Sequence, residues 1–241
     1  MNKQKKMNNY EAIEEKLGIV FQDKSLLDIA LTHRSYLNEH KEVSLQNNER
    51  IEFLGDAVLE LIISSYLFKE YPNKPEGDLT NIRAALVRTE SLAEESRNLG
   101  IGEYLRMSKG EKESGGRDKD YLLANTFEAV LGAIYQDQGF DVCKTYIERT
   151  LLMKADRIVE NNLFIDPKTQ AQEIIQAKFK VTPIYEVLKQ DGPDHDKTFT
   201  VALKINNKQI ASGTGSSKQK AEEAAAKETV NLLENQANPL N

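Results

Sequence analysis

The stretch NERIEFLGDAVLELII, residues 48–63, places apolar side chains on almost every side of a predicted helix. A helix that is apolar all round is typical of a protein interior. Within it, however, Glu52 and Asp56 lie four residues apart and therefore share one face. Two like charges repel each other at that spacing, and a buried, unpaired charge costs several kcal/mol. The pair needs a compensating charge, and Gly55 between them leaves room for a second backbone or a ligand.

A second apolar helix repeats this anomaly. In LLANTFEAVL, residues 122–131, Asn125 and Glu128 lie three residues apart among apolar neighbours. Carboxylate and amide oxygens suit Mg²⁺ or Mn²⁺, whereas zinc favours His and Cys, of which the chain has three and one. If the two helices pack together, we expect a divalent metal site formed by Glu52, Asp56, Asn125 and Glu128.

Arginines offer the competing explanation, because Arg50 and Arg83 are available to neutralise the acids. For one isolated buried carboxylate, neutralisation is the better interpretation. Two acid-bearing faces on two apolar helices favour the metal site instead.

Length and composition indicate a two-domain globular protein. The chain has 241 residues, of which 39% are hydrophobic and 29% charged. It contains no apolar run of the roughly 18–20 residues that span a bilayer, so we expect no membrane partner. A single cysteine, Cys143, and an N-terminus without a secretory signal favour the cytoplasm. The net charge of −6 belongs to residues 1–165, since residues 166–241 are balanced.

The first 160 residues predict an all-α domain, because apolar residues recur there at helical spacing. The segment 109–119, rich in glycine and basic residues, predicts an exposed loop. The expected helices are 10–18, 25–32, 48–71, 78–88, 91–99, 121–138 and 140–159.

After residue 165 the pattern changes to α-β-β-β-α. Asp166 and Pro167 predict the start of a helix that ends near Phe179. Strand-like alternation follows in 184–190, 198–205 and 209–215, and a last helix is expected over 218–233. Asn206-Asn207 predicts the hairpin turn between the second and third strands.

Residues 48–59 resemble the signature of the ribonuclease III family. The similarity continues through PEGDL (75–79), RAALV (83–87), GEYL (102–105) and FEA (127–129). It extends over essentially the whole chain and is greatest to the bacterial single-chain form with one nuclease domain.

The resemblance implies roles for individual acids. The implied metal-binding set is Glu52, Asp56, Asn125 and Glu128. Asp56 and Glu128 are the implied catalytic residues, and Glu49 and Glu76 match further acids near a dimeric cleavage centre. The family usually has aspartate at the position of Asn125. An amide oxygen still binds Mg²⁺, but the site loses one negative charge.

The α-β-β-β-α segment resembles a double-stranded RNA-binding domain. An A-form duplex displays its 2′-hydroxyls in a shallow minor groove, where polar side chains reach them. The helix N-terminus that carries two lysines favours phosphate. The implied RNA-binding residues are Thr169, Gln172, Glu173, His195, Lys218 and Lys220. The family usually has a further lysine where Gln219 stands.

Together these features predict a two-domain protein: an all-α ribonuclease III-type endonuclease domain (8–160), a linker (161–165), a double-stranded RNA-binding domain (166–235) and a tail (236–241). We expect a homodimer that cuts both strands of double-stranded RNA with divalent-metal-activated water. The expected products carry 5′-phosphates, 3′-hydroxyls and short 3′ overhangs, and the implied setting is processing of ribosomal precursors and other structured RNAs. The alternatives are a double-stranded RNA-binding protein disabled at Asn125, and a metal-dependent hydrolase with another substrate.

Overall fold

The chain forms two compact units, one up to Phe164 and one from Ile165 onward. The computed structural model describes residues 3–42, 44–193 and 197–235. Each unit has its own hydrophobic core. Within the described ranges, no helix is long and apolar enough to cross a membrane.

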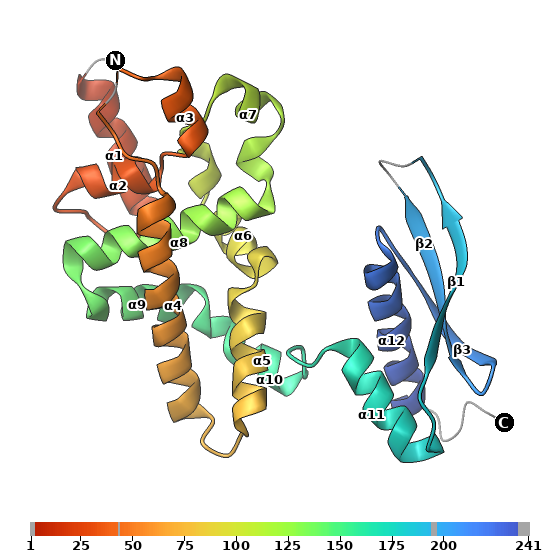
Figure 1. The fold of residues 1–241 in the computed structure, drawn as a ribbon. Helices are drawn as coiled ribbons and strands as arrows, with labels where there is room; N and C mark the ends of the chain where they lie inside the picture. The colour runs from red at the N-terminus through yellow and green to blue at the C-terminus, as the bar shows by residue number, and fades with distance from the viewer. Residues whose placement is uncertain (1–2, 43, 194–196, 236–241) are drawn as a thin grey trace. The chain divides into compact units, whose positions relative to one another are not determined.

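The first unit is helical, as its periodicity predicts (Figure 1). Its α-helices are α1 Lys3–Leu17, α2 Lys24–Ala30, α3 Arg34–Glu39, α4 Glu49–Glu70, α5 Glu76–Val87, α6 Thr89–Asn98, α7 Lys109–Glu113, α8 Asp120–Gln138, α9 Phe140–Thr150 and α10 Ala155–Glu160. Short 3-10 turns lie between some of them: η1 Ile101–Glu103, η2 Gly116–Asp118 and η3 Leu152–Lys154.

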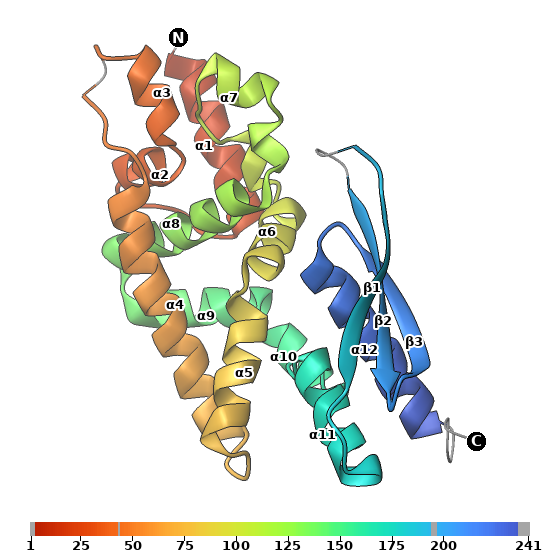
Figure 2. The ribbon, with the colours of Figure 1, turned by 45° about the vertical axis from the view of Figure 1, so that its right-hand side comes forward.

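Helix α8 runs through the core of this unit, because eleven of its residues are buried. It crosses α4 and packs against α2, α6 and α9 as well (Figures 1 and 2). Gly139 ends α8 with φ of +83°, a value that favours glycine, and the chain turns there into α9.

The start of α4 is fixed by backbone hydrogen bonds. The buried Asn48 donates its N–H to the carbonyl of Thr32 at 2.9 Å. On the other side of Thr32, the Arg106 N–H donates to Leu31 O at 2.8 Å, and the His33 N–H donates to Arg106 O at 2.9 Å. The N-terminal turn of α4, which carries the first acids, is therefore held against the body of the unit.

The prediction that α4 is buried on nearly every side is wrong. Phe53, Leu61 and Phe68 on this helix are 79%, 58% and 78% exposed. Apolar periodicity predicts which side of a helix is buried from water. It cannot predict whether the core of the same chain or a second molecule buries that side.

Two further predictions need correction. Residues 109–119 are not an open loop: they form α7 and η2, and Lys119 Nζ closes them by donating to Glu111 Oε1 at 2.7 Å. The single helix expected over 140–159 is interrupted after Thr150 by η3 before α10 begins.

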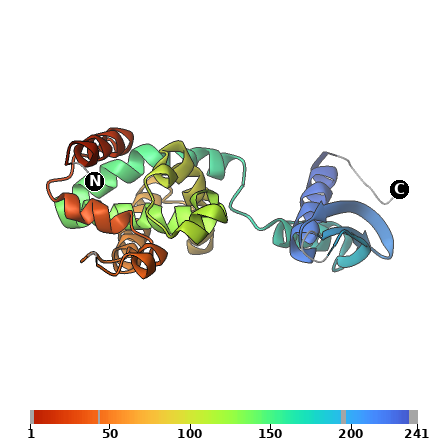
Figure 3. The same cartoon turned by 90° about the horizontal axis from the view of Figure 1, so that it is seen from above.

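The second unit has the predicted α-β-β-β-α order. Its elements are α11 Pro167–Phe179, β1 Ile184–Asp191, β2 Thr198–Ile205, β3 Lys208–Gly215 and α12 Lys218–Asn235. The strands form an antiparallel sheet in the order β1-β2-β3. Both helices lie on one side of the sheet (Figures 1 and 3), and a small core is enclosed between them.

Local sequence signals in the second unit have the predicted effect. The Asp166 carboxylate accepts a hydrogen bond from Thr169 N at 2.9 Å, so Asp166 caps α11, and Pro167 is its first residue. Asn206 and Asn207 have φ values of 49° and 65°, and they form the turn between β2 and β3.

Candidate active site

Two glycines allow α4 and α8 to touch through their backbones. A Cβ atom added at Gly55 would lie 1.8 Å from the carbonyl oxygen of Glu128. A Cβ atom added at Gly132 would lie 2.1 Å from the carbonyl oxygen of Ile51. Both distances are far below van der Waals contact, so no larger residue fits at either position without moving a helix. Gly55 stands out in the sequence between Glu52 and Asp56, whereas the only signal for Gly132 is its place four residues after Glu128.

This crossing brings together the four residues predicted for the metal site. Glu52 and Asp56 come from α4, and Asn125 and Glu128 come from α8. The side chain of Asn125 donates a hydrogen bond to Glu52, and the charge of Asp56 acts on both Glu52 and Glu128. Asp56 is exposed, whereas the other three are half-buried. The cluster is thus open to solvent on the Asp56 side.

The carboxylates of the cluster hold protons unusually firmly. Burial raises the pKa of Glu52 to about 7, and the nearby charges of Glu49 and Asp56 contribute. Burial also raises the pKa of Glu128 to about 8, again with help from Asp56 and Glu52. Loss of solvent and repulsion between neighbouring acids both disfavour the charged form. Ionising both acids is therefore unfavourable unless a positive charge compensates them.

Arginine does not provide that compensation. Arg83 donates instead to the hydroxyl of Ser64 at 2.8 Å, and Arg50 is exposed. Among the described residues, no lysine or arginine forms an ion pair with Glu52, Asp56 or Glu128. Structural neutralisation, the alternative considered for the sequence, is not how this chain accommodates the acids.

The donor set fits a hard divalent cation in its chemistry, since it offers three carboxylates and one amide oxygen. It is not a preformed cage: within the described parts of the chain, no three His, Cys, Asp or Glu side chains converge closely enough to hold a metal ion. Ionised carboxylates repel one another, which opposes their close convergence. The expectation that a divalent cation binds here therefore depends on the chemical type of the donor atoms and on the absence of a basic partner for the acids.

The two further acids lie in different surroundings. Glu49 is exposed one turn before Glu52, where it forms an ion pair with Arg34 at 3.6 Å. Glu76 is exposed at the start of α5 and accepts a hydrogen bond from Thr80 at 2.9 Å. Helix α5 begins next to the C-terminal end of α4 (Figure 1), and that end of α4 lies roughly 20 Å along the helix from Gly55. Glu76 is therefore not part of the cluster within one chain.

The predicted RNA-binding residues lie on the two helices of the second unit. Thr169, Gln172 and Glu173 form one exposed face of α11. Lys218 and Lys220 are exposed in the first turn of α12. His195 lies outside the described residues.

An ion pair that was not foreseen joins these two regions. Lys168, next to Thr169, contacts Glu222 at 2.5 Å and lies over the ring of Tyr185 at 5.0 Å. The N-terminal ends of α11 and α12 are thereby held side by side, which places the two groups of predicted contact residues near each other.

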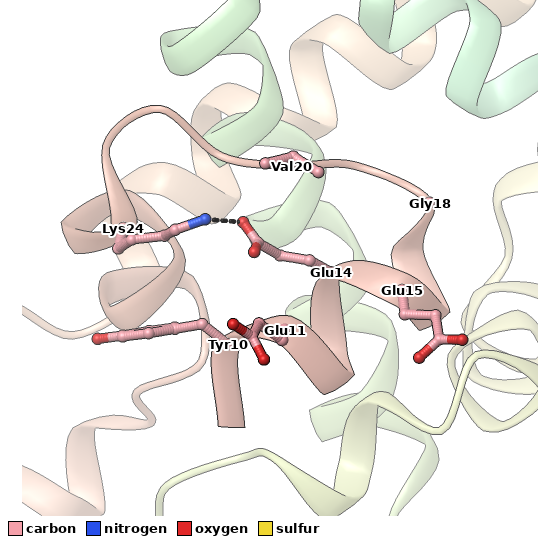
Figure 4. A pocket seen from close by; sticks show the side chains of 7 residues that line it. All are labelled: Tyr10, Glu11, Glu14, Glu15, Gly18, Val20 and Lys24. Atoms are coloured by element: carbon pink, nitrogen blue, oxygen red, sulfur yellow. Dashed lines mark hydrogen bonds and ion pairs between the residues drawn. The ribbon is translucent and has the colours of Figure 1, made fainter. Parts of the chain in front are cut away.

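A cavity of about 700 Å³ lies in the first unit, between α1 and the segment that leads into α2 (Figure 4). Its buried acid, Glu14, accepts a hydrogen bond from Phe21 N at 2.6 Å and forms an ion pair with Lys24. These partners account for Glu14 as a structural carboxylate that ties α1 to α2.

Comparisons with known proteins identify the family of each unit. The ribonuclease-III-like family profile matches residues 23–155, and the double-stranded RNA binding motif matches residues 167–233. Ribonuclease 3 of Streptococcus mutans is 46% identical over 231 residues, covering 93% of this chain and 98% of that protein. Ribonuclease 3 of Lactococcus lactis subsp. cremoris is 44% identical over 222 residues, covering 91% of this chain and 95% of that protein.

Among solved structures, the nuclease domain of ribonuclease III from Campylobacter jejuni has a TM-score of 0.55 and 42% sequence identity. The match covers 60% of this chain and 96% of that domain. The chain belongs to the ribonuclease III family and is a double-stranded RNA endoribonuclease with its nuclease domain and RNA-binding motif on one polypeptide.

Proposed function

We propose that Glu52, Asp56, Glu128 and the amide oxygen of Asn125 hold the divalent cations that cut double-stranded RNA. The observation that carries this proposal is the uncompensated charge where α4 crosses α8: two of the acids have pKa values of about 7 and about 8, and no basic residue pairs with them in the described parts of the chain. The ribonuclease III family depends on divalent metal. Mg²⁺ is the proposed cofactor and Mn²⁺ its substitute, because both favour oxygen ligands.

Divalent ions held by these residues would supply a water of lowered pKa and would stabilise charge on the leaving oxygen. The chain's own residues provide the binding site and its geometry. The amide of Asn125 fixes Glu52 by a hydrogen bond, and the backbone contact at Gly55 fixes Glu128. Asp56, the exposed acid, faces the solvent from which the phosphodiester arrives. Hydrolysis that releases the 3′ oxygen leaves a 5′-phosphate and a 3′-hydroxyl.

The exposed side of α4 supports a homodimer. Phe53, Leu61 and Phe68 form an apolar surface along this helix, and such surfaces mark sites that another molecule covers. The solved nuclease domain from Campylobacter jejuni has a region described as involved in dimer formation. A two-fold dimer presents one site to each antiparallel strand of a duplex. Two separated cuts then give the short 3′ overhangs expected for the products.

A dimer also gives the distant acid a role. Glu76 lies too far from the cluster of its own chain, so we place it near the cleavage centre of the partner subunit. Glu49 lies one turn before Glu52 and borders the cluster of its own chain. Each cleavage centre of the dimer would thus have Glu49 from one subunit and Glu76 from the other. Both are proposed as acids of the dimeric site rather than as members of the four-residue cluster.

The second unit is proposed to deliver the duplex. Thr169, Gln172 and Glu173 would contact minor-groove hydroxyls, and Lys218 and Lys220 would contact phosphates at the start of α12. The proposed domain limits are 8–160 for the nuclease and 166–235 for the RNA-binding domain. Precursors of ribosomal RNA and other structured RNAs are the proposed substrates.

The decisive experiment compares the wild type with Glu128→Gln and Asn125→Asp on a long RNA duplex, in Mg²⁺ and then in Mn²⁺. We expect metal-dependent cleavage by the wild type that is lost in Glu128→Gln, while Asn125→Asp alters the metal requirement. Duplex binding without cleavage in either metal, with activity appearing only in Asn125→Asp, would mean that the native chain is an RNA-binding protein on a disabled nuclease scaffold.

A further inference from the structure

One exposed aromatic residue lies in line with the candidate site. Tyr121, Asn125 and Glu128 are spaced by four and three residues on α8, so the three side chains share one face. Tyr121 is 52% exposed. It precedes Asn125 by about 6 Å and Glu128 by about 10 Å along the helix axis. The face that carries two of the four cluster residues therefore continues into solvent through this tyrosine.

The environment of Tyr121 leaves its hydroxyl available. Its ring and hydroxyl make no hydrogen bond or ring contact among the described residues. The nearby cation, Lys119, is already engaged, since its Nζ donates to Glu111 at 2.7 Å and to Ser114 at 3.0 Å. Lys119 and Tyr121 interact electrostatically, but no hydrogen bond among the described residues fixes the tyrosine. Its exposed side chain lies one turn before Asn125 on the face that carries the cluster residues of α8.

The charge of the cluster limits what kind of side chain can hold RNA beside it. The cluster contains three acids, Glu52, Asp56 and Glu128, and Glu49 lies one turn before Glu52. Wherever they are ionised and no metal offsets them, these carboxylates repel the phosphates of an approaching strand. A lysine at this place would be drawn to the acids rather than to the RNA. A tyrosine hydroxyl is uncharged and both donates and accepts hydrogen bonds. It can contact a ribose hydroxyl or a phosphate oxygen without competing with metal for the carboxylates.

We propose that Tyr121 contacts the sugar–phosphate backbone of the strand being cut and sets the position of the scissile phosphodiester over the cluster. This inference rests on the proposed function and adds a substrate-contacting residue to it. The contact is made through the hydroxyl, and the ring adds packing against the ribose.

The test uses Tyr121→Phe, which removes only the hydroxyl, and Tyr121→Ala, which removes the ring as well. The control is Met153→Ala, because Met153 is 73% exposed and lies on η3, apart from α4 and α8. Three quantities are measured on the full-length protein: steady-state kcat and KM with a defined duplex, the distribution of cut positions, and the melting temperature.

We expect Tyr121→Phe to raise KM by roughly threefold to tenfold, the range for loss of one hydrogen bond, while kcat stays within about twofold. Tyr121→Ala should raise KM further and spread the cuts over neighbouring positions. All variants should melt with the wild type, since an exposed side chain contributes little to stability.

Unchanged KM and unchanged cut positions in both Tyr121 variants, with a wild type that cleaves, would overturn this inference alone. A lowered melting temperature in Tyr121→Phe would also overturn it, because the hydroxyl would then have a structural role. Absence of divalent-dependent cleavage in the wild type and in Met153→Ala would overturn the proposed function together with it.

Discussion

Replacing Gly132 by alanine tests whether the backbone contact between α4 and α8 sets the geometry of the site. The added methyl group would lie 2.1 Å from the carbonyl oxygen of Ile51, whereas ordinary contact begins at 3.4 Å. The helices must therefore separate by about 1.3 Å, since the nearest atom is backbone and cannot rotate away. Overpacking of this kind costs roughly 1–3 kcal/mol.

That separation has two measurable consequences. A loss of roughly 1–3 kcal/mol lowers the melting temperature by roughly 2–4 °C for each kcal/mol in a unit of this size. A displacement of about 1 Å at catalytic groups costs about a hundredfold in rate. We therefore expect Gly132→Ala to fold, to bind duplex RNA with wild-type affinity, and to cleave it about a hundredfold more slowly at saturating Mg²⁺.

The assay is single-turnover cleavage, combined with duplex binding in EDTA and with thermal unfolding. Gly110→Ala is the matched control, because a Cβ atom there meets nothing within 4 Å. If Gly132→Ala cleaves within twofold of the wild type and melts at the same temperature, the helices do not need this close approach and the reasoning is refuted.

Four further predictions concern the titration of the acids, the subunit contact and the packing of the second unit. Because the pKa values of Glu52 and Glu128 are raised to about 7 and about 8, Mn²⁺ affinity measured by calorimetry should rise with pH through that range; a flat profile would contradict their role as ligands. The same raised values mean that the metal-free folded state retains protons that the unfolded state releases, so the free energy of unfolding should fall from about pH 4.5 to pH 8. Phe53→Ser combined with Phe68→Ser should convert a dimer into monomers in light scattering, whereas a wild type that is already monomeric at micromolar concentration would count against the dimer. Gly213→Ala should destabilise the second unit and weaken duplex binding, because its Cβ atom would lie 2.2 Å from the Ala225 nitrogen, and unchanged binding would show that this packing is not required.

The second unit could be predicted well because its signals are local. A capping aspartate followed by proline fixes the start of α11, and a pair of asparagines that adopt positive φ fixes the turn after β2. Strand alternation with period two gives the remaining elements. Each signal acts within a few residues, so the sequence alone carries it.

The first unit is less predictable from its sequence wherever contacts between distant residues determine the local structure. Apolar residues on every side of α4 favour full burial, yet Phe53 and Phe68 face solvent. Apolar composition alone does not distinguish a core from a surface that another molecule covers. Segment 109–119 looked like an open loop because glycine and lysine dominate it. Its helical turn is held by contacts to distant residues, such as the 3.0 Å bond from Lys109 N to Glu39.

The candidate site contains features that local sequence predicts and features that depend on long-range packing. The four-residue spacing of Glu52 and Asp56 and the three-residue spacing of Asn125 and Glu128 were visible in the sequence, and so was the idea that the two helices meet. The role of Gly132 could not be predicted, because a glycine in an apolar helix is required only where another backbone packs against it. The exposure of Asp56 and the free hydroxyl of Tyr121 likewise depend on how the helices cross.

The most direct test of the central claim is X-ray diffraction at the manganese absorption edge from crystals of the full chain grown with Mn²⁺. We expect an anomalous peak bounded by Glu52, Asp56, Glu128 and the side-chain oxygen of Asn125, and its loss in Glu128→Gln. An ordered site with these side chains unchanged and no anomalous peak between them, under conditions where the same protein cleaves RNA, would contradict it.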